Sequence, residues 1–149
     1  MSRATPQMLN FARRLVADER LENKSSEART PAGFPTTDRL RPHLATLMGN
    51  NGFRALLIRA LTLARAEVPW LRAVNVRADG ALEGFESPQA ELAAADFLNG
   101  RIVLLAHLLG LLVAFIGPNL TQRLVGEIWP KIPLHGLDSV NGGKNEKTK

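Results

Sequence analysis

Apolar and polar residues alternate with helical spacing at the start of the chain. The apolar positions lie three or four residues apart, at Met8, Phe11, Ala12 and Leu15, and this spacing is typical of an amphipathic helix. Thr5 suits the N-cap, and Pro6 suits the first helical position, where a missing N–H is tolerated. The pattern predicts a helix from Thr5 to about Asn23. Residues 23–37 are rich in Ser, Thr, Pro and Gly, so we expect a linker or long loop there.

Two further helices are predicted before the chain changes its pattern. The earlier one begins near Thr37 and ends at Gly49, a residue that commonly terminates helices. Within it, Pro42 is tolerated only if it falls in the first turn. The later helix covers residues 53–68 and carries a broad apolar stripe. Because residues 49–52 read GNNG, we expect a turn that makes the two helices an antiparallel hairpin.

The hydrophobic pattern then takes a period of two. Val74 and Val76 alternate with polar neighbours, and Asp79-Gly80 is a favoured hairpin turn. The sequence therefore predicts a short β-hairpin from about residue 73 to residue 85. A two-stranded ribbon is marginal in water, so this one must pack on the helices or pair with another edge.

A short helix should follow the hairpin. Ser87 and Pro88 repeat the capping residue and proline that open the first helix, and the helix should continue to about Leu98. Asn99 and Gly100 predict its end, because this residue pair favours turns.

The most apolar segment, residues 102–117, reads IVLLAHLLGLLVAFIG. A helix of this length spans roughly 24 Å, which is less than the roughly 30 Å hydrocarbon core of a membrane. We therefore expect a central core helix, with membrane insertion less favoured. After Gly117 and Pro118, residues 119–130 should form a last amphipathic helix, in which Leu120, Leu124 and Ile128 repeat every four residues.

The composition fits a helical fold. The chain has 149 residues, no Tyr, no Cys and many Leu and Ala residues, and unbranched side chains favour helix. We expect a mainly α fold: a compact bundle of five or six helices with one short β-hairpin, formed as a single domain by residues 1–130. Residues 131–149 lack periodicity, so we expect a largely disordered polar tail. The absence of Cys excludes a disulfide scaffold, and the N-terminus lacks a signal-peptide pattern, so the prediction is a cytoplasmic protein.

The net charge of +5 is unevenly distributed. Residues 31–80 contain seven basic and three acidic residues, whereas residues 81–130 contain two basic and five acidic residues. The seven basic residues are all arginines: Arg39, Arg41, Arg54, Arg59, Arg65, Arg72 and Arg77. Because arginine binds phosphate and carboxylate in a bidentate manner, they are candidate contacts for nucleic acid or for an acidic partner. The helix at 53–68 offers few base-reading side chains, so non-specific phosphate contact ranks above sequence-specific recognition.

The sequence carries no recognisable catalytic or metal-binding motif. It lacks HExxH, GxSxG and a phosphate-binding glycine loop, and His43, His107 and His135 do not follow zinc spacing. We therefore predict no cofactor, no metal and no catalytic residue, and favour a non-enzymatic protein. His107 lies among leucines with no carboxylate one turn away, which indicates a buried, neutral side chain. His43 lacks the lysine and glycine expected just after a phosphoacceptor histidine.

These patterns favour a helical protein-interaction or regulatory adaptor that self-associates. Association would bury the remaining apolar surface, while the opposite charges of the middle and later segments would set orientation. The candidate interface residues lie on the helix at 101–116: Leu105, Leu109, Leu112 and Phe115. The alternatives are a nucleic-acid-binding regulator that uses the arginines and a membrane-active protein that acts through residues 102–117. The sequence leaves the partner and the oligomeric state open.

Overall fold

The computed structural model describes residues 4–26 and 33–130, and the side chains of residues 4–19 and 33–130. The elements are α1 (Pro6–Ser26), α2 (Pro35–Glu67), the 3₁₀ helix η1 (Pro69–Ala73), β1 (Asn75–Val76), β2 (Leu82–Glu83), α3 (Glu86–Glu91), α4 (Ala94–Ile116) and α5 (Pro118–Ile128). These elements confirm the predicted mainly α fold with one short hairpin. The loop predicted at 23–37 is shorter at both ends, and residues 27–32 and the predicted tail at 131–149 lie outside the described residues.

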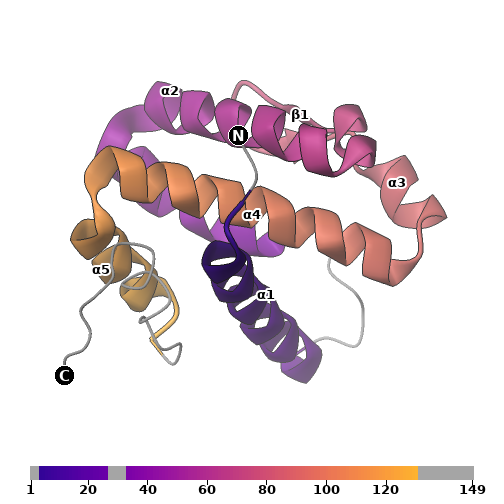
Figure 1. Cartoon of the computed structure of the whole chain (residues 1–149), viewed down its shortest axis with the longest axis horizontal. Coiled ribbons are helices and arrows are strands. Elements are labelled where there is room, and N and C mark those ends of the chain that lie inside the picture. The colour runs from indigo at the N-terminus through magenta and orange to yellow at the C-terminus, as the bar shows by residue number, and fades with distance from the viewer. Residues whose placement is uncertain (1–3, 27–32, 131–149) are drawn as a thin grey trace.

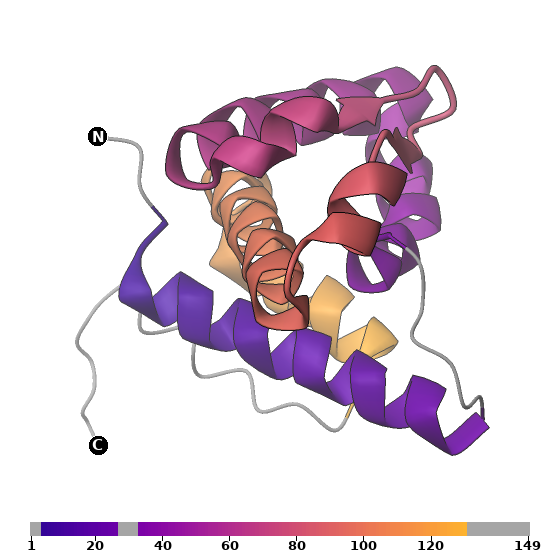
Figure 2. The same ribbon diagram turned by 90° about the vertical axis from the view of Figure 1, so that its right-hand side faces the viewer.

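Helix α4 lies at the centre of the molecule (Figure 1). α1 crosses it on one side, and the two halves of α2 lie along other sides (Figure 2). Side chains of α4 from Phe97 to Leu112 are mostly buried. The prediction of a core helix at 101–116 is therefore confirmed.

The length argument against membrane insertion was wrong. α4 has 23 residues, or roughly 34 Å, because it starts at Ala94. In the described part of the chain it is the one helix long and apolar enough to cross a membrane by these two measures. However, 61% of its most apolar window is buried inside the chain, and this burial accounts for its composition in a core helix.

A single residue, Gly49, divides α2 into two halves. Its φ of 81° and ψ of 161° lie outside the helical region, while its neighbours on both sides stay helical. The expected four-residue turn is thus replaced by a sharp break at one glycine, since glycine adopts a positive φ without strain. The halves diverge from this break along different sides of α4 (Figures 1 and 2).

Pro42 lies inside α2, beyond its first turn, contrary to the expectation. A proline there removes one backbone hydrogen bond of the helix. Its side chain is exposed, so this part of the helix faces solvent and water can satisfy the carbonyl that loses its partner.

The hairpin forms where the alternating pattern predicts it. β1 and β2 are antiparallel, with Asn75 opposite Glu83 and Val76 opposite Leu82. Gly80 in the turn has a φ of 88°, which explains the glycine at this position. The ribbon is not isolated, because β1 packs on α2.

The predicted helix break at Asn99 and Gly100 was wrong, because both residues lie inside α4. Gly100 is instead required for close packing, since a Cβ at this position would lie 2.2 Å from Cζ2 of Trp70. The Trp70 ring also stacks on Phe97, with the ring centroids 4.8 Å apart. The glycine therefore admits an aromatic ring against the helix backbone, and the chain breaks between α3 and α4 instead.

Candidate functional site

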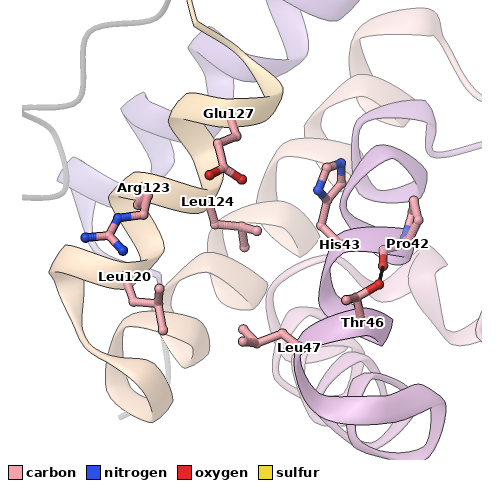
Figure 3. A pocket seen from close by; sticks show the side chains of 8 residues that line it. All are labelled: Pro42, His43, Thr46, Leu47, Leu120, Arg123, Leu124 and Glu127. Atoms are coloured by element: carbon pink, nitrogen blue, oxygen red, sulfur yellow. Dashed lines mark hydrogen bonds between the residues drawn. The ribbon is translucent and has the colours of Figure 1, made fainter.

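A groove opens between the earlier half of α2 and α5 (Figure 3). Its volume is about 530 Å³, within the range of roughly 300–1,000 Å³ that is typical of binding clefts. We call it the α2–α5 groove. It is lined by Pro42, His43, Thr46 and Leu47 from α2 and by Leu120, Arg123, Leu124 and Glu127 from α5.

Both walls of this groove carry exposed leucines. Leu47 on α2 is 46% exposed and Leu120 on α5 is 38% exposed. Phe115, close to the end of α4, is 66% exposed. In the described part of the chain the exposed large apolar side chains are these three and Ile58. The end of α4, the break in α2 and the start of α5 meet at one end of the molecule (Figure 1), so three of the four belong to this end.

Leu120 is exposed and Leu124 only partly buried, because α5 buries a different face from the expected one. Leu120 and Leu124 were expected to share the buried face with Ile128. The structure buries Thr121, Val125 and Ile128 instead. The hydroxyl of Thr121 donates a hydrogen bond to the Gly117 carbonyl at 2.7 Å, so this polar group is satisfied inside the core. The pattern of α5 is thus amphipathic, but its leucines line the groove.

The polar groups of the groove lie at its rim. Figure 3 shows His43 and Glu127 pointing toward each other from the two walls, while Arg123 extends away from α2. The Thr46 hydroxyl donates to the Pro42 carbonyl at 3.0 Å, so it is engaged within its own helix. The groove therefore combines an apolar floor with a histidine, an anion and a cation at the edge.

Three of the seven candidate arginines hold the fold together. Arg39 pairs with Glu19 on α1 at 2.9 Å and donates to the Ile128 carbonyl at 2.9 Å. Arg54 donates to the carbonyls of Arg77 and Val76, at 2.9 and 3.4 Å, and Arg65 donates to those of Leu71 and Val74, at 3.3 and 2.6 Å. These guanidinium groups satisfy backbone oxygens, which reduces what they offer to a phosphate.

The other four arginines come from different segments of the chain: Arg41 from the earlier half of α2, Arg59 from the later half, Arg72 from η1 and Arg77 from the hairpin turn. Arg41 and Arg77 act on the same carboxylate, Asp79. The backbone N–H of Ala81 lowers the pKa of Asp79 most, and the two arginines lower it further. The structure therefore brings Arg41, Arg54 and Arg77 to the hairpin. It places Arg39 elsewhere, beside Ile128 at the C-terminal end of α5.

The candidate interface leucines of α4 are not on the surface. Leu105, Leu109 and Leu112 have no exposed area, because α1 and α2 cover this face of α4. Among the four candidates, only Phe115 is available to a partner in this fold.

His107 has a carboxylate partner that the sequence reasoning missed. Its Nε2 lies 2.6 Å from Oε2 of Glu67 at the end of α2, and the same oxygen accepts the backbone N–H of Ala4 at 2.9 Å. The side chain of His107 is 6% exposed and that of Glu67 14%. The partner lies 40 residues away in the chain, so no helical spacing rule could have found it. The pair joins α2, α4 and the segment before α1.

A second buried carboxylate joins α1 to the end of α5. Oε1 of Glu19 accepts the Arg39 guanidinium and also the indole N–H of Trp129 at 3.3 Å. The guanidinium carbon lies 5.3 Å from the centre of the Trp129 ring. Trp129 is 1% exposed, so it seals the core beside the end of α5.

Among the described side chains, those of residues 4–19 and 33–130, no three His, Asp or Glu residues cluster in a way that would hold a metal ion. His135 lies outside the described residues. No family model, no curated protein and no solved structure matches the chain.

Proposed function

We propose that this chain is a non-enzymatic protein-interaction module that docks an amphipathic helix in the α2–α5 groove. The observation that carries the proposal is the exposure of Leu47 and Leu120 on opposite walls of one groove. Exposed apolar side chains gathered at one place mark interaction sites more often than isolated ones do.

The shape of the groove favours a helical partner. Its two walls are helices, and the apolar residues of α5 that face it, Leu120 and Leu124, are one turn apart. A partner helix that presents apolar residues at positions i, i+4 and i+7 would place them on this floor. The rim groups His43, Arg123 and Glu127 would then contact polar residues at the edges of the partner helix and fix its direction.

The chemistry of the groove supports binding over catalysis. A nucleophile needs an adjacent base that is held in place by a third group. The Thr46 hydroxyl is engaged by the Pro42 carbonyl, and Figure 3 shows His43 on the side of the helix that faces Glu127. The groove thus presents apolar area with a charged rim, which is the usual composition of a docking site.

The proposal is tested by affinity purification of the tagged full-length chain from native cells, with two groove variants and a control. Leu47→Ser and Leu120→Ser remove apolar area from the walls. Ile58→Ser is the matched control, since Ile58 is 39% exposed on the other half of α2. We expect both groove variants to lose a protein, including untagged copies of this chain, that wild type and the control retain. Equal recovery by all four baits, or no specific recovery, would overturn the proposal.

The second candidate function is non-specific nucleic-acid binding at the hairpin, favoured by the convergence of Arg41, Arg54 and Arg77 there. Against it, Arg54 is engaged by backbone oxygens and Asp79 lies among these cations. Fluorescence anisotropy with a random DNA duplex is the measurement. Binding that weakens steeply with added salt and with Arg41→Ala would support this function, and no binding at low salt would exclude it.

A further inference from the structure

We infer that the helix that occupies the α2–α5 groove is α5 of a second copy of this chain, packed antiparallel against the first α5, so that two copies form a symmetric dimer. This inference rests on the proposed function, because it uses the same groove.

The first argument is that α5 is itself the kind of helix that the groove fits. Its residues in the groove are Leu120, Arg123, Leu124 and Glu127. They occupy positions i, i+3, i+4 and i+7, which form one stripe along a helix. In this stripe Leu120 and Leu124 lie one turn apart, Arg123 lies to one side of them and Glu127 lies in the following turn. Because α5 buries an adjacent face, with Thr121 and Val125, in its own core, the outer side of this stripe, with Leu120 38% exposed, is left for a partner.

The second argument is the order of the two charges. A two-fold axis perpendicular to α5 brings the same surface of both copies together with the helices running in opposite directions. Reversal then places Arg123 of one copy near Glu127 of the other, and the symmetry makes this contact twice. A parallel arrangement would place each charge beside its own kind. The face is therefore electrostatically complementary to itself in the antiparallel direction alone.

The third argument is the distribution of apolar surface around the stripe. Leu47 on the α2 wall lines the groove and is 46% exposed. A second copy seated on α5 lies against the α2 wall and can cover Leu47 together with Leu120. Self-association thus covers two of the four exposed large apolar side chains in the described residues.

Sedimentation equilibrium of the purified full-length protein tests the inference, with charge reversals on α5. We expect wild type to be a dimer at high micromolar concentration. R123E and E127R each replace both attractive contacts by repulsive ones and should weaken the dimer by about tenfold or more. Arg59→Glu, an exposed reversal on the later half of α2, is the control and should leave the dimer unchanged.

A mixture of R123E and E127R protein provides the sharpest result. One chain then carries two glutamates and the other two arginines at these positions, so each weakened homodimer should be replaced by a stable heterodimer. Circular dichroism spectra that match wild type exclude misfolding as the reason for weak homodimers.

Several outcomes would overturn the inference. They are a wild-type monomer, single reversals that dimerise as wild type does, and a mixture that fails to form the heterodimer. If wild type is a monomer but still retains another protein through Leu47 and Leu120, this inference is wrong and the proposed function stands. If retention of that protein does not depend on Leu47 and Leu120, the proposed function is wrong.

Discussion

Replacing Glu19 by alanine tests how much the tie between α1 and the end of α5 contributes to stability. Glu19 is 7% exposed, and its Oε1 accepts from Arg39 at 2.9 Å and from the indole N–H of Trp129 at 3.3 Å. The substitution removes the acceptor for both donors at once.

The expected loss follows from the burial of the two donors. A hydrogen bond to a charged group contributes roughly 1.5–3 kcal/mol. The lower end applies here, because the side chain of Arg39 is 37% exposed and water can replace the carboxylate. The indole N–H of Trp129, which is 1% exposed, is left without an acceptor at a cost of about 1 kcal/mol. We expect Glu19→Ala to lower the free energy of unfolding by about 2–3 kcal/mol, which corresponds to roughly 5–10 °C in the melting temperature for a chain of this size.

Chemical denaturation followed by circular dichroism measures this change. Trp129→Phe removes only the indole donor and should cost less than Glu19→Ala. Asp18→Ala, which removes the adjacent carboxylate on α1, is the matched control and should lie within about 0.5 kcal/mol of wild type. If Glu19→Ala were as stable as the control, the contacts of Glu19 would contribute nothing and the reasoning would be refuted.

Three other substitutions test separate parts of the structure. Gly100→Ala should destabilise by at least about 2 kcal/mol, because its Cβ would lie 2.2 Å from the Trp70 ring; a melting temperature equal to wild type would show that the ring moves away freely. His107→Leu should cost about 2 kcal/mol, since it leaves the Glu67 carboxylate, 14% exposed, without its 2.6 Å partner; unchanged denaturation at pH 7 would mean that the pair adds no stability. Burial raises the pKa of Asp38 above its ordinary value of 3.8, against a smaller opposing effect of a neighbouring arginine. The stabilising contribution of protonated Asp38 to the free energy of unfolding is therefore present below pH 3.8 and is lost as the pH rises through the raised pKa. Asp38→Asn should flatten the pH dependence of the free energy of unfolding in that range. The change should be less than about 0.5 kcal/mol, because the Asp38 side chain is 48% exposed. Identical pH profiles of unfolding for the variant and wild type would contradict this.

The elements of the fold were largely predictable, because their signals are local. The cap and proline at Thr5 and Pro6 mark the start of α1, where the Thr5 hydroxyl accepts the Met8 N–H at 3.1 Å. The turn residues Asp79 and Gly80 mark the hairpin in the same way. Such signals act within a few residues, so the sequence displays them directly.

Glycine shows where the local signals fail. Gly49 breaks α2 at a positive φ, whereas Gly100 continues α4 under the Trp70 ring. Both glycines belong to short runs with asparagine, and the sequence reasoning treated both as turns. The difference lies in Trp70, which comes from another part of the chain and packs on one glycine only.

The candidate site could be predicted only in part, for the same reason. The repeat of Leu120 and Leu124 was visible in the sequence, but which face of α5 is buried depends on where α2 and α4 lie. The groove also needs His43 and Leu47, which are more than 70 residues earlier in the chain. No periodic pattern connects positions that far apart.

The arginines at the hairpin also bear on how the protein avoids aggregation. A short ribbon has two edges, and an open edge invites a strand from another molecule. In β1 the backbone groups of alternate residues point away from β2. On that side the carbonyl of Val74 accepts a hydrogen bond from Arg65, and the carbonyl of Val76 accepts one from Arg54. A foreign strand would have to displace both guanidinium groups before it could pair. The same two side chains that anchor the ribbon to α2 therefore protect its outer edge against unwanted strand addition.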